Sequence, residues 1–210
     1  MEQNLPEYKD RYRLIYNPLD TQKIHIKAEE KISDIPEKNG FVFVSIGRFA
    51  AQKRFDRIPE VAAQLKRKGL LFQWLVIGDG EVFVAVQQKW KEYDVCDCVY
   101  LLGSRANPYP YIKAADMVVL TSQYEAHPMV INEGLILHKP VITTQYPSAA
   151  EVVSDRQNGM ICSNDIEGIV QAMSFVIEDV SLRKRLTENA EEFVYDNKSI
   201  VGKVLRLLEL

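Results

Sequence analysis

Short apolar runs that alternate with amphipathic segments are the feature of this chain that most restricts its fold. The runs are apolar at successive positions and rich in β-branched residues, which is typical of strands buried on both faces. They occupy residues 41–46, 72–77, 98–102, 117–121 and 141–143, and a sixth run, 160–162, follows a turn signal at 155–159. Segments with helical spacing lie between the runs, at residues 57–67, 81–93, 109–114 and 129–137, and three more follow between residues 166 and 210.

This order predicts an α/β protein with a doubly wound, Rossmann-like, mostly parallel sheet of about six strands and helices on both faces. We expect a turn-rich lead-in over residues 1–40, the α/β domain over 41–180 and C-terminal helices over 181–210. A chain of 210 residues buries roughly 70% of its unfolded surface, so it can build its own core. Ligands of such sheets bind beyond the carboxyl ends of the strands.

Net charge and cysteine usage exclude several classes of protein. The formal net charge is −3 and the 26 Lys and Arg residues are dispersed, so we expect no nucleic-acid partner. Cys96, Cys98 and Cys162 lack the paired spacing of a zinc site and fit a reducing compartment. No run of about 18 apolar residues occurs, and residues 1–20 hold no leader-like apolar core. The chain is therefore predicted to be cytoplasmic.

The loop at residues 47–53 carries two cations directly after the first predicted strand. Arg48 and Lys53 can converge there on one diphosphate, Arg48 as a planar fork and Lys53 as a point charge. The alternative is that Lys53, Arg54 and Arg57 form the solvated face of a helix start. Cations at a helix N-terminus oppose the helix dipole, which favours the binding role.

The second loop, Gly78-Asp79-Gly80, resembles the beginning of a dinucleotide-binding fingerprint. The third glycine of that fingerprint would fall at position 83, where this chain has Phe83. The sequence therefore does not support an NAD site, and a tight turn before the next helix is sufficient to explain both glycines.

Residues 122–134 are the most informative segment. Pro128 suits the first position of a helix, whose next amides and positive dipole end form an anion site. Glu133 lies in this otherwise apolar helix and is expected to be buried, so it needs hydrogen-bond donors. Sugar hydroxyls, a structural Arg or backbone amides could each supply these hydrogen bonds to Glu133.

A glycosidase pair is a poor interpretation of Glu125 and Glu133. Eight helical residues rise about 12 Å, more than the roughly 5–9.5 Å between glycosidase carboxylates. Both side chains suit the binding of hydroxyls better. His127 lacks a visible catalytic partner and is interpreted as a residue of the binding loop.

Several motifs occur here in the order typical of one enzyme family. They are residues 107–116 (NPYPYIKAAD), 122–125 (SQYE), Glu133 and 139–144 (KPVITT), with Gly47-Arg48 and Lys53, Gly78 to Gly80, Glu151 and Asn158-Gly159 around them. Over roughly residues 12–205 the chain resembles the donor-binding, C-terminal half of group 1 (family 4) retaining glycosyltransferases, which have the GT-B fold. Glu125 and Glu133 match the family's E-x7-E motif, and residues 15–18 resemble its crossing segment.

The resemblance implies a role for each matched residue. Arg48 and Lys53 would bind the donor diphosphate and offset charge on the leaving nucleoside diphosphate. Glu125 would contact the transferred sugar, Glu133 the ribose hydroxyls, and loop 103–106 would border the base. Arg48, Lys53 and Glu125 are thus the candidate catalytic residues. The other candidate donor-binding residues are Gly47, Gly78, Gly80, Ser104, His127, Pro128, Met129, Val130 and Glu133.

Some features depart from the family pattern or are not required by it. Ala126 and His127-Pro128 stand where the family typically has glycines, which leaves the loop shape and the sugar open. No Asp-x-Asp pair occurs, so no metal or other cofactor is expected beside the nucleoside-diphosphate sugar, the donor substrate.

The implied function is a hexosyltransferase that transfers sugar with retention to a saccharide or lipid-linked acceptor, in surface or capsular polysaccharide biosynthesis. About 40 residues precede the first predicted strand, too few for the family's acceptor domain, so we expect this chain alone to be inactive. Peripheral association of the full-length enzyme with the inner face of the membrane stays open. The alternatives are a nucleotide-sugar epimerase of the same architecture and a noncatalytic nucleotide-binding or interaction module.

Overall fold

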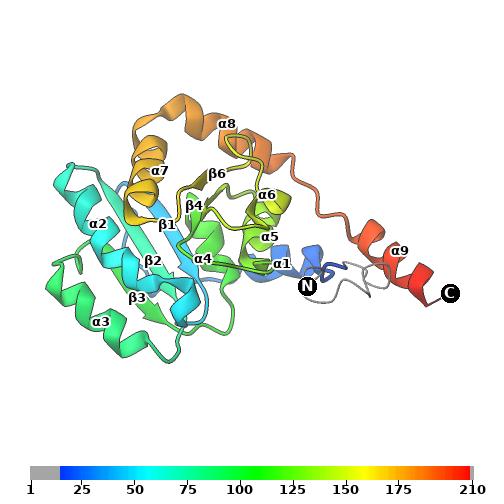
Figure 1. Cartoon of the computed structure of the whole chain (residues 1–210), viewed down its shortest axis with the longest axis horizontal. Helices are drawn as coiled ribbons and strands as arrows, with labels where there is room; N and C mark the ends of the chain where they lie inside the picture. Colours follow the sequence, from blue (N-terminus) through cyan, green and yellow to red (C-terminus); the bar gives the residue numbers. More distant parts are fainter. Residues whose placement is uncertain (1–14, 209–210) are drawn as a thin grey trace. The chain divides into compact units, whose positions relative to one another are not determined.

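The structure, a computed structural model, describes residues 15–208 and divides the chain into two compact units (Figure 1). One unit spans residues 21–194 and contains the whole sheet. The other joins residues at the two ends of the chain, including α9 (Asn197–Leu207). In this second unit, the Leu19 amide donates to Asn197 Oδ1 at 3.0 Å and Asn197 Nδ2 donates to the Leu19 carbonyl at 2.6 Å. These reciprocal bonds tie the two terminal segments together.

The larger unit contains a six-stranded sheet in the order β3-β2-β1-β4-β5-β6, and every neighbouring pair is parallel. The strands are β1 (Phe41–Ile46), β2 (Phe72–Ile77), β3 (Val99–Gly103), β4 (Met117–Leu120), β5 (Val141–Thr144) and β6 (Gly159–Cys162). The predicted doubly wound parallel sheet is therefore confirmed. The first two strands have the predicted bounds, and the other four differ from prediction by one residue at one or both ends.

Helices cover both faces of the sheet (Figure 1). One face carries α2 (Ile58–Arg67), α3 (Phe83–Glu92) and α7 (Ile166–Glu178), and the other carries α1 (Thr21–Ala28), α4 (Tyr109–Ala114) and α5 (Met129–Ile136). The remaining helical elements of this unit are η2 (Ala51–Lys53), η3 (Phe55–Arg57), α6 (Ala149–Val152) and α8 (Val180–Glu191).

The core between the sheet, α2 and α7 is apolar and contains one satisfied polar group. Phe43 and Trp74 are fully buried there. Ser45 on β1 is also fully buried, but its hydroxyl accepts from Trp74 Nε1 at 3.0 Å and donates to the Val119 carbonyl at 2.6 Å. A buried hydroxyl with both bonds formed avoids the desolvation penalty, so Ser45 fits a central strand.

Two helices were absent from the sequence prediction. Helix α1 lies in the region 1–40, where the sequence predicts a turn-rich lead-in, and it buries only Ile24 and Ala28, which gives a weak helical pattern. Helix α6 has four residues, too few to show a period. In addition, α5 begins at Met129, and Pro128 is its extended N-cap with φ −73° and ψ 107°, so the prediction of Pro128 as the first helical residue was wrong by one position.

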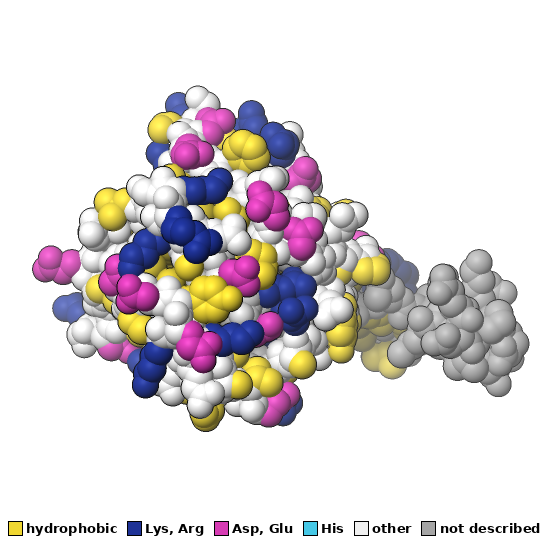
Figure 2. All heavy atoms as spheres, turned by 60° about the vertical axis from the view of Figure 1, so that its left-hand side comes forward, with side chains coloured by type: hydrophobic (Ala, Val, Ile, Leu, Met, Phe, Trp, Pro, Cys, Tyr) yellow, Lys and Arg dark blue, Asp and Glu magenta, His cyan; other side chains and the backbone are white. Residues whose placement is uncertain are grey.

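Charged side chains are mixed on the surface that Figure 2 presents. Lys and Arg alternate there with Asp and Glu, and hydrophobic side chains lie between them. This face has no continuous basic surface, in agreement with the dispersed charges of the sequence.

Candidate functional site

The loops that follow β1 and β2 are joined by backbone hydrogen bonds at the carboxyl edge of the sheet. The Phe49 amide donates to the Asp79 carbonyl at 2.9 Å, and the Val82 amide donates to the Phe49 carbonyl at 3.1 Å. A Cβ on Gly78 would lie 1.8 Å from the Gly47 carbonyl oxygen, and one on Gly80 would lie 2.7 Å from the Phe49 carbonyl oxygen. Both glycines thus permit close approach of two loops, a reason more specific than the tight turn expected from sequence.

Arg48 extends into solvent from the first of these loops. Its side chain is 75% exposed, and its Nε lies 3.2 Å from Glu81 Oε2, which is itself largely exposed. Exposed ion pairs of this kind contribute little to stability. The Arg48 guanidinium is therefore accessible to a ligand at this edge.

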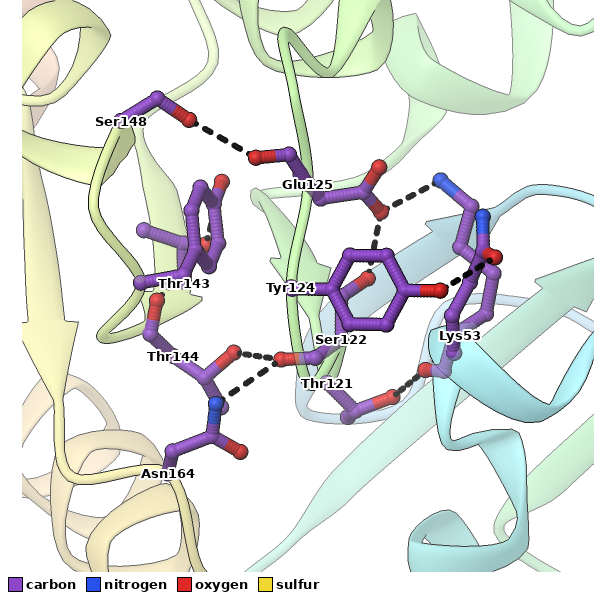
Figure 3. A network of polar contacts seen from close by, with 11 residues as sticks. Lys53, Thr121, Ser122, Tyr124, Glu125, Thr143, Thr144, Ser148 and Asn164 are labelled. Carbon is purple, nitrogen blue, oxygen red and sulfur yellow. Dashed lines mark hydrogen bonds and ion pairs between the residues drawn. The ribbon is translucent and has the colours of Figure 1, made fainter. Parts of the chain in front are cut away.

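Unlike Arg48, Lys53 points away from solvent and into a polar cluster (Figure 3). Its Nζ lies 2.6 Å from Glu125 Oε1, and the two side chains are only 18% and 9% exposed. Arg57 is also buried, and donates to Asn164 Oδ1 at 2.6 Å and to the Thr121 carbonyl at 3.2 Å. The alternative of a solvated helix start is therefore wrong for Lys53 and Arg57.

Glu125 is held by three neighbours in this cluster (Figure 3). Besides Lys53, Ser122 donates its hydroxyl to Glu125 Oε1 at 2.6 Å. Ser148 donates to the backbone carbonyl of Glu125 at 2.9 Å. Charge-assisted bonds to one carboxylate oxygen fix the side chain firmly. Glu125 lies in the loop after β4, outside helix α5, so the helical rise assumed between Glu125 and Glu133 does not apply.

The loop that carries Glu125 is fastened to its surroundings by polar side chains from other segments (Figure 3). Thr121 donates to the Lys53 carbonyl at 2.9 Å, and Thr144 donates to the Ser122 carbonyl. Asn164 Nδ2 donates to the Gln123 carbonyl at 2.8 Å. Sequence reasoning missed Ser122, Thr144, Ser148 and Asn164 as contributors to the site. Ser122 and Thr144 lie within the quoted motifs 122–125 and 139–144, whereas Ser148 and Asn164 come from loops after β5 and β6 and give no local signal.

Glu133 on α5 forms a polar contact separate from the Lys53–Glu125 cluster. Its Oε1 accepts from Tyr109 Oη at 3.2 Å, and Tyr109 is another residue that sequence reasoning did not assign to the site. Burial raises the pKa of the Glu133 carboxyl, and the Tyr109 bond opposes this rise. Burial and the neighbouring Glu133 raise the pKa of Tyr109 to about 12, so Tyr109 is a donor at neutral pH. Among residues 15–208, no hydrogen bond or ion pair joins Glu133 directly to the Lys53–Glu125 cluster.

The predicted anion site lies at the start of α5, which begins one residue later than predicted. Pro128 is extended, and the following residues Met129 and Val130 form the first turn of the helix, whose amides carry the positive dipole end. His127 Nε2 lies 3.1 Å from Asn132 Nδ2, so it accepts from that amide. Burial lowers the pKa of His127, which favours the neutral ring that accepts this bond.

Ser104 is exposed in the loop after β3, where the family resemblance implies that the base of the nucleotide would lie. The neighbouring Arg105 anchors this loop, because its guanidinium lies 2.6 Å from Asp34 Oδ2 and its Nε donates to Tyr111 Oη at 3.0 Å. No group of three or more His, Cys, Asp or Glu that could hold a metal occurs within the described part of the chain. That part also contains no helix of the length and hydrophobicity needed to span a membrane.

The fold and the polar cluster define an α/β domain of the kind that binds a ligand beyond the carboxyl ends of its strands. The chain belongs to the family described as Glycosyl transferases group 1, whose sequence model matches residues 26–193. The family resemblance noted from the motifs is therefore confirmed.

Individual relatives are similar over most of this chain. It is 29% identical over 205 residues to the lipopolysaccharide core biosynthesis glycosyltransferase LpsE of Rhizobium meliloti, which covers 96% of this chain and 58% of LpsE. It is 28% identical over 210 residues to N-acetylgalactosamine-N,N'-diacetylbacillosaminyl-diphospho-undecaprenol 4-alpha-N-acetylgalactosaminyltransferase of Campylobacter jejuni. That match covers 98% of this chain and 56% of the relative. The chain spans roughly half the length of such curated relatives.

A solved structure has the same fold. The Anabaena protein Alr3699/HepE, in complex with UDP and glucose, superposes with a TM-score of 0.82 at 21% identity, over 96% of this chain and 57% of that one. At this identity the likeness concerns the fold alone.

Proposed function

We propose that residues 21–194 are the donor-binding domain of a retaining hexosyltransferase that uses a nucleoside-diphosphate sugar. The acceptor is a saccharide or a lipid-linked saccharide, and the product belongs to a surface polysaccharide. The chain alone binds the donor but does not complete a transfer, because the acceptor is held by another part of the enzyme.

The ion pair between Lys53 and Glu125 is the observation that carries this proposal. It unites a cation and a carboxylate at the carboxyl edge, and Arg48 stands exposed on the same loop as Lys53. A nucleoside-diphosphate sugar presents a diphosphate beside sugar hydroxyls, so it needs cations next to a hydroxyl acceptor. This cluster offers both.

Each group has a defined task in the proposed reaction. An ammonium has three N–H donors, so the bond from Lys53 to Glu125 leaves donors for phosphate oxygens. Lys53 and Arg48 stabilise the negative charge that develops on the departing diphosphate. Glu125, held by Ser122 and Lys53, accepts hydrogen bonds from the transferred sugar. Glu133 accepts from the ribose hydroxyls, with Tyr109 fixing its orientation.

The names of relatives support the donor and acceptor classes. The UDP-Gal:alpha-D-GlcNAc-diphosphoundecaprenol alpha-1,3-galactosyltransferase of Escherichia coli is 26% identical over 186 residues. Its name specifies a UDP-hexose donor and a lipid-linked acceptor, and the Anabaena structure contains UDP and glucose. We propose a cytoplasmic location, which the free thiols of Cys96, Cys98 and Cys162 support.

Calorimetric titration of the 210-residue chain with UDP and with GDP tests this function. We expect saturable binding of one nucleotide, weakened about 10-fold or more in both Arg48→Ala and Glu133→Ala because each loses a hydrogen bond to the ligand that involves a charged group. The matched control is Lys113→Ala, which breaks an exposed ion pair with Glu29 away from this edge.

Two results would contradict the proposal. One is the absence of binding by either nucleotide to a folded chain. The other is wild-type affinity in both site variants. Binding of a protein partner without nucleotide affinity would indicate the noncatalytic module instead.

A further inference from the structure

A cavity lies at the amino edge of the sheet, away from the loops of the proposed donor site. Its volume is about 720 Å³, within the usual range of small-molecule sites. Phe41 and Met117 open strands β1 and β4, and Pro140 directly precedes β5, so their place on the sheet is opposite the carboxyl ends. Residues of α8 close the other side.

Most charges around this cavity are matched within the protein. Lys38 Nζ lies 2.6 Å from Asp116 Oδ1, and Lys184 Nζ lies 3.6 Å from Glu188 Oε1. The lining thus contains two cation–carboxylate pairs. It also contains two cations, Arg183 and Lys139, that form no ion pair with a carboxylate of the described residues.

The Arg183 side chain contacts the C-terminal end of helix α7. It donates to the Ile177 carbonyl at 2.6 Å, and its guanidinium lies 5.7 Å from the centroid of the Phe41 ring. A cation at this position offsets the negative end of the helix dipole. The Arg183 guanidinium is therefore held in place by the Ile177 carbonyl and the Phe41 ring.

Lys139 is the remaining cation. Its side-chain ammonium forms no hydrogen bond and no ion pair with any residue in the described range 15–208. Burial lowers the pKa of Lys139, and the charge of Asp116 opposes this change. A half-buried ammonium with no carboxylate within ion-pair distance is unfavourable, and an anion in the cavity would relieve it.

The rest of the wall is apolar. Phe41, Met117, Pro140, Ile177 and Val180 line the cavity, and Leu71, 58% exposed, stands at its rim. Such walls favour a ligand with an apolar body, because each buried CH₂ contributes favourable transfer energy.

We propose that this cavity binds a small amphipathic carboxylate, with the carboxylate on Lys139 and an aliphatic body against the apolar wall. The site lies at the amino edge of the sheet, so it is separate from the proposed donor site.

Titration of the full chain with octanoate by calorimetry at pH 7 tests the proposal. We expect one saturable site with a Kd on the order of 1 mM or below. Lys139→Met should weaken octanoate binding about 10-fold or more, because a charge-assisted contact is lost. Leu71→Asp, which places a negative charge at the exposed rim, should also weaken it. Lys89→Met, at an exposed position of α3 outside the cavity lining, serves as the matched control and should bind as wild type.

Two further ligands separate the charge from the apolar body. Acetate and 1-octanol should each bind at least about 10-fold more weakly than octanoate, because each lacks one half of the recognised chemistry. The proposal is overturned if octanoate does not bind, if Lys139→Met binds it as wild type, or if acetate binds equally well. If Lys139→Met fails to fold, unchanged affinity in Leu71→Asp overturns it. Nucleotide is not used in this assay, so its outcome is independent of the proposed donor site.

Discussion

Lys53 and Lys139 lie at opposite edges of one parallel sheet and have opposite electrostatic surroundings. At the carboxyl edge, Lys53 is 18% exposed and its Nζ lies 2.6 Å from Glu125, which Ser122 also holds. At the amino edge, Lys139 has no hydrogen-bond or ion-pair partner among the described residues, and burial lowers its pKa. A lysine removed from solvent can therefore be held in an ion pair by the protein, or be left for a ligand to neutralise. Burial alone does not distinguish the two.

The largest expected change in stability comes from Lys53→Met. It leaves Glu125 in a largely buried position without its cation, so the free energy of unfolding should fall by about 3 kcal/mol, the lower end for broken buried pairs. Urea denaturation at pH 7 measures this. Adding Glu125→Gln should recover part of the loss, since it removes the unpaired charge. A Lys53→Met variant as stable as wild type would show that the ion pair does not organise this edge.

Ser122→Ala tests the second partner of Glu125. Loss of a hydroxyl donor to a carboxylate should reduce the free energy of unfolding by about 1.5 kcal/mol. The same change should weaken UDP binding, because Glu125 would lose part of its orientation. Ser163→Ala is the matched control, since Ser163 is exposed and donates to Asp165 instead. Equal effects of the two substitutions would contradict a special role for Ser122.

Glu133→Gln should change the free energy of unfolding by a smaller amount, and should increase it. Burial raises the pKa of Glu133 above its ordinary value of 4.5, so ionisation disfavours the folded state as pH rises above that value. The variant lacks this penalty and should unfold at a higher denaturant concentration at pH 7. The stability difference between variant and wild type should shrink as pH falls toward 4.5, because the Glu133 carboxyl then becomes protonated in the folded state. A difference that is independent of pH would contradict this explanation.

Lys139→Met is expected to have the smallest effect on stability. Because the ammonium has no partner among the described residues, its removal should leave the free energy of unfolding within about 0.5 kcal/mol of wild type, or raise it. Denaturation beside Lys53→Met completes the comparison of the two edges. A loss as large as that of Lys53→Met would show that Lys139 is engaged within the protein.

The sheet and its helices were largely predictable from sequence because fully buried strands produce continuous apolar runs. Strand β2, for example, is buried along its whole length and its bounds were predicted without error. Helix α1 was not predictable, because two buried residues in eight give little periodicity. The motif carboxylates Glu125 and Glu133 could be assigned as a pair, but their geometry could not, because Glu125 lies outside the helix.

The supporting residues of the candidate site were harder to predict for a different physical reason. Ser148 and Asn164 reach the site from loops that follow β5 and β6, so only the folded sheet brings them to Glu125 and its loop. Gly78 and Gly80 could be recognised as turn residues, but the close backbone approach of the neighbouring loop depends on strand register. Tertiary juxtaposition of this kind leaves no local pattern.

In the proposed function, the carboxyl edge of the sheet binds the nucleotide. The most direct test is a chemical-shift titration of the isotope-labelled 210-residue chain with UDP, followed through backbone amides by NMR. We expect saturable shifts in residues 47–53, 78–80 and 127–133, and unchanged amides around Lys139 and Arg183. Shifts confined to the amino edge, or none in a folded chain with either UDP or GDP, would contradict it.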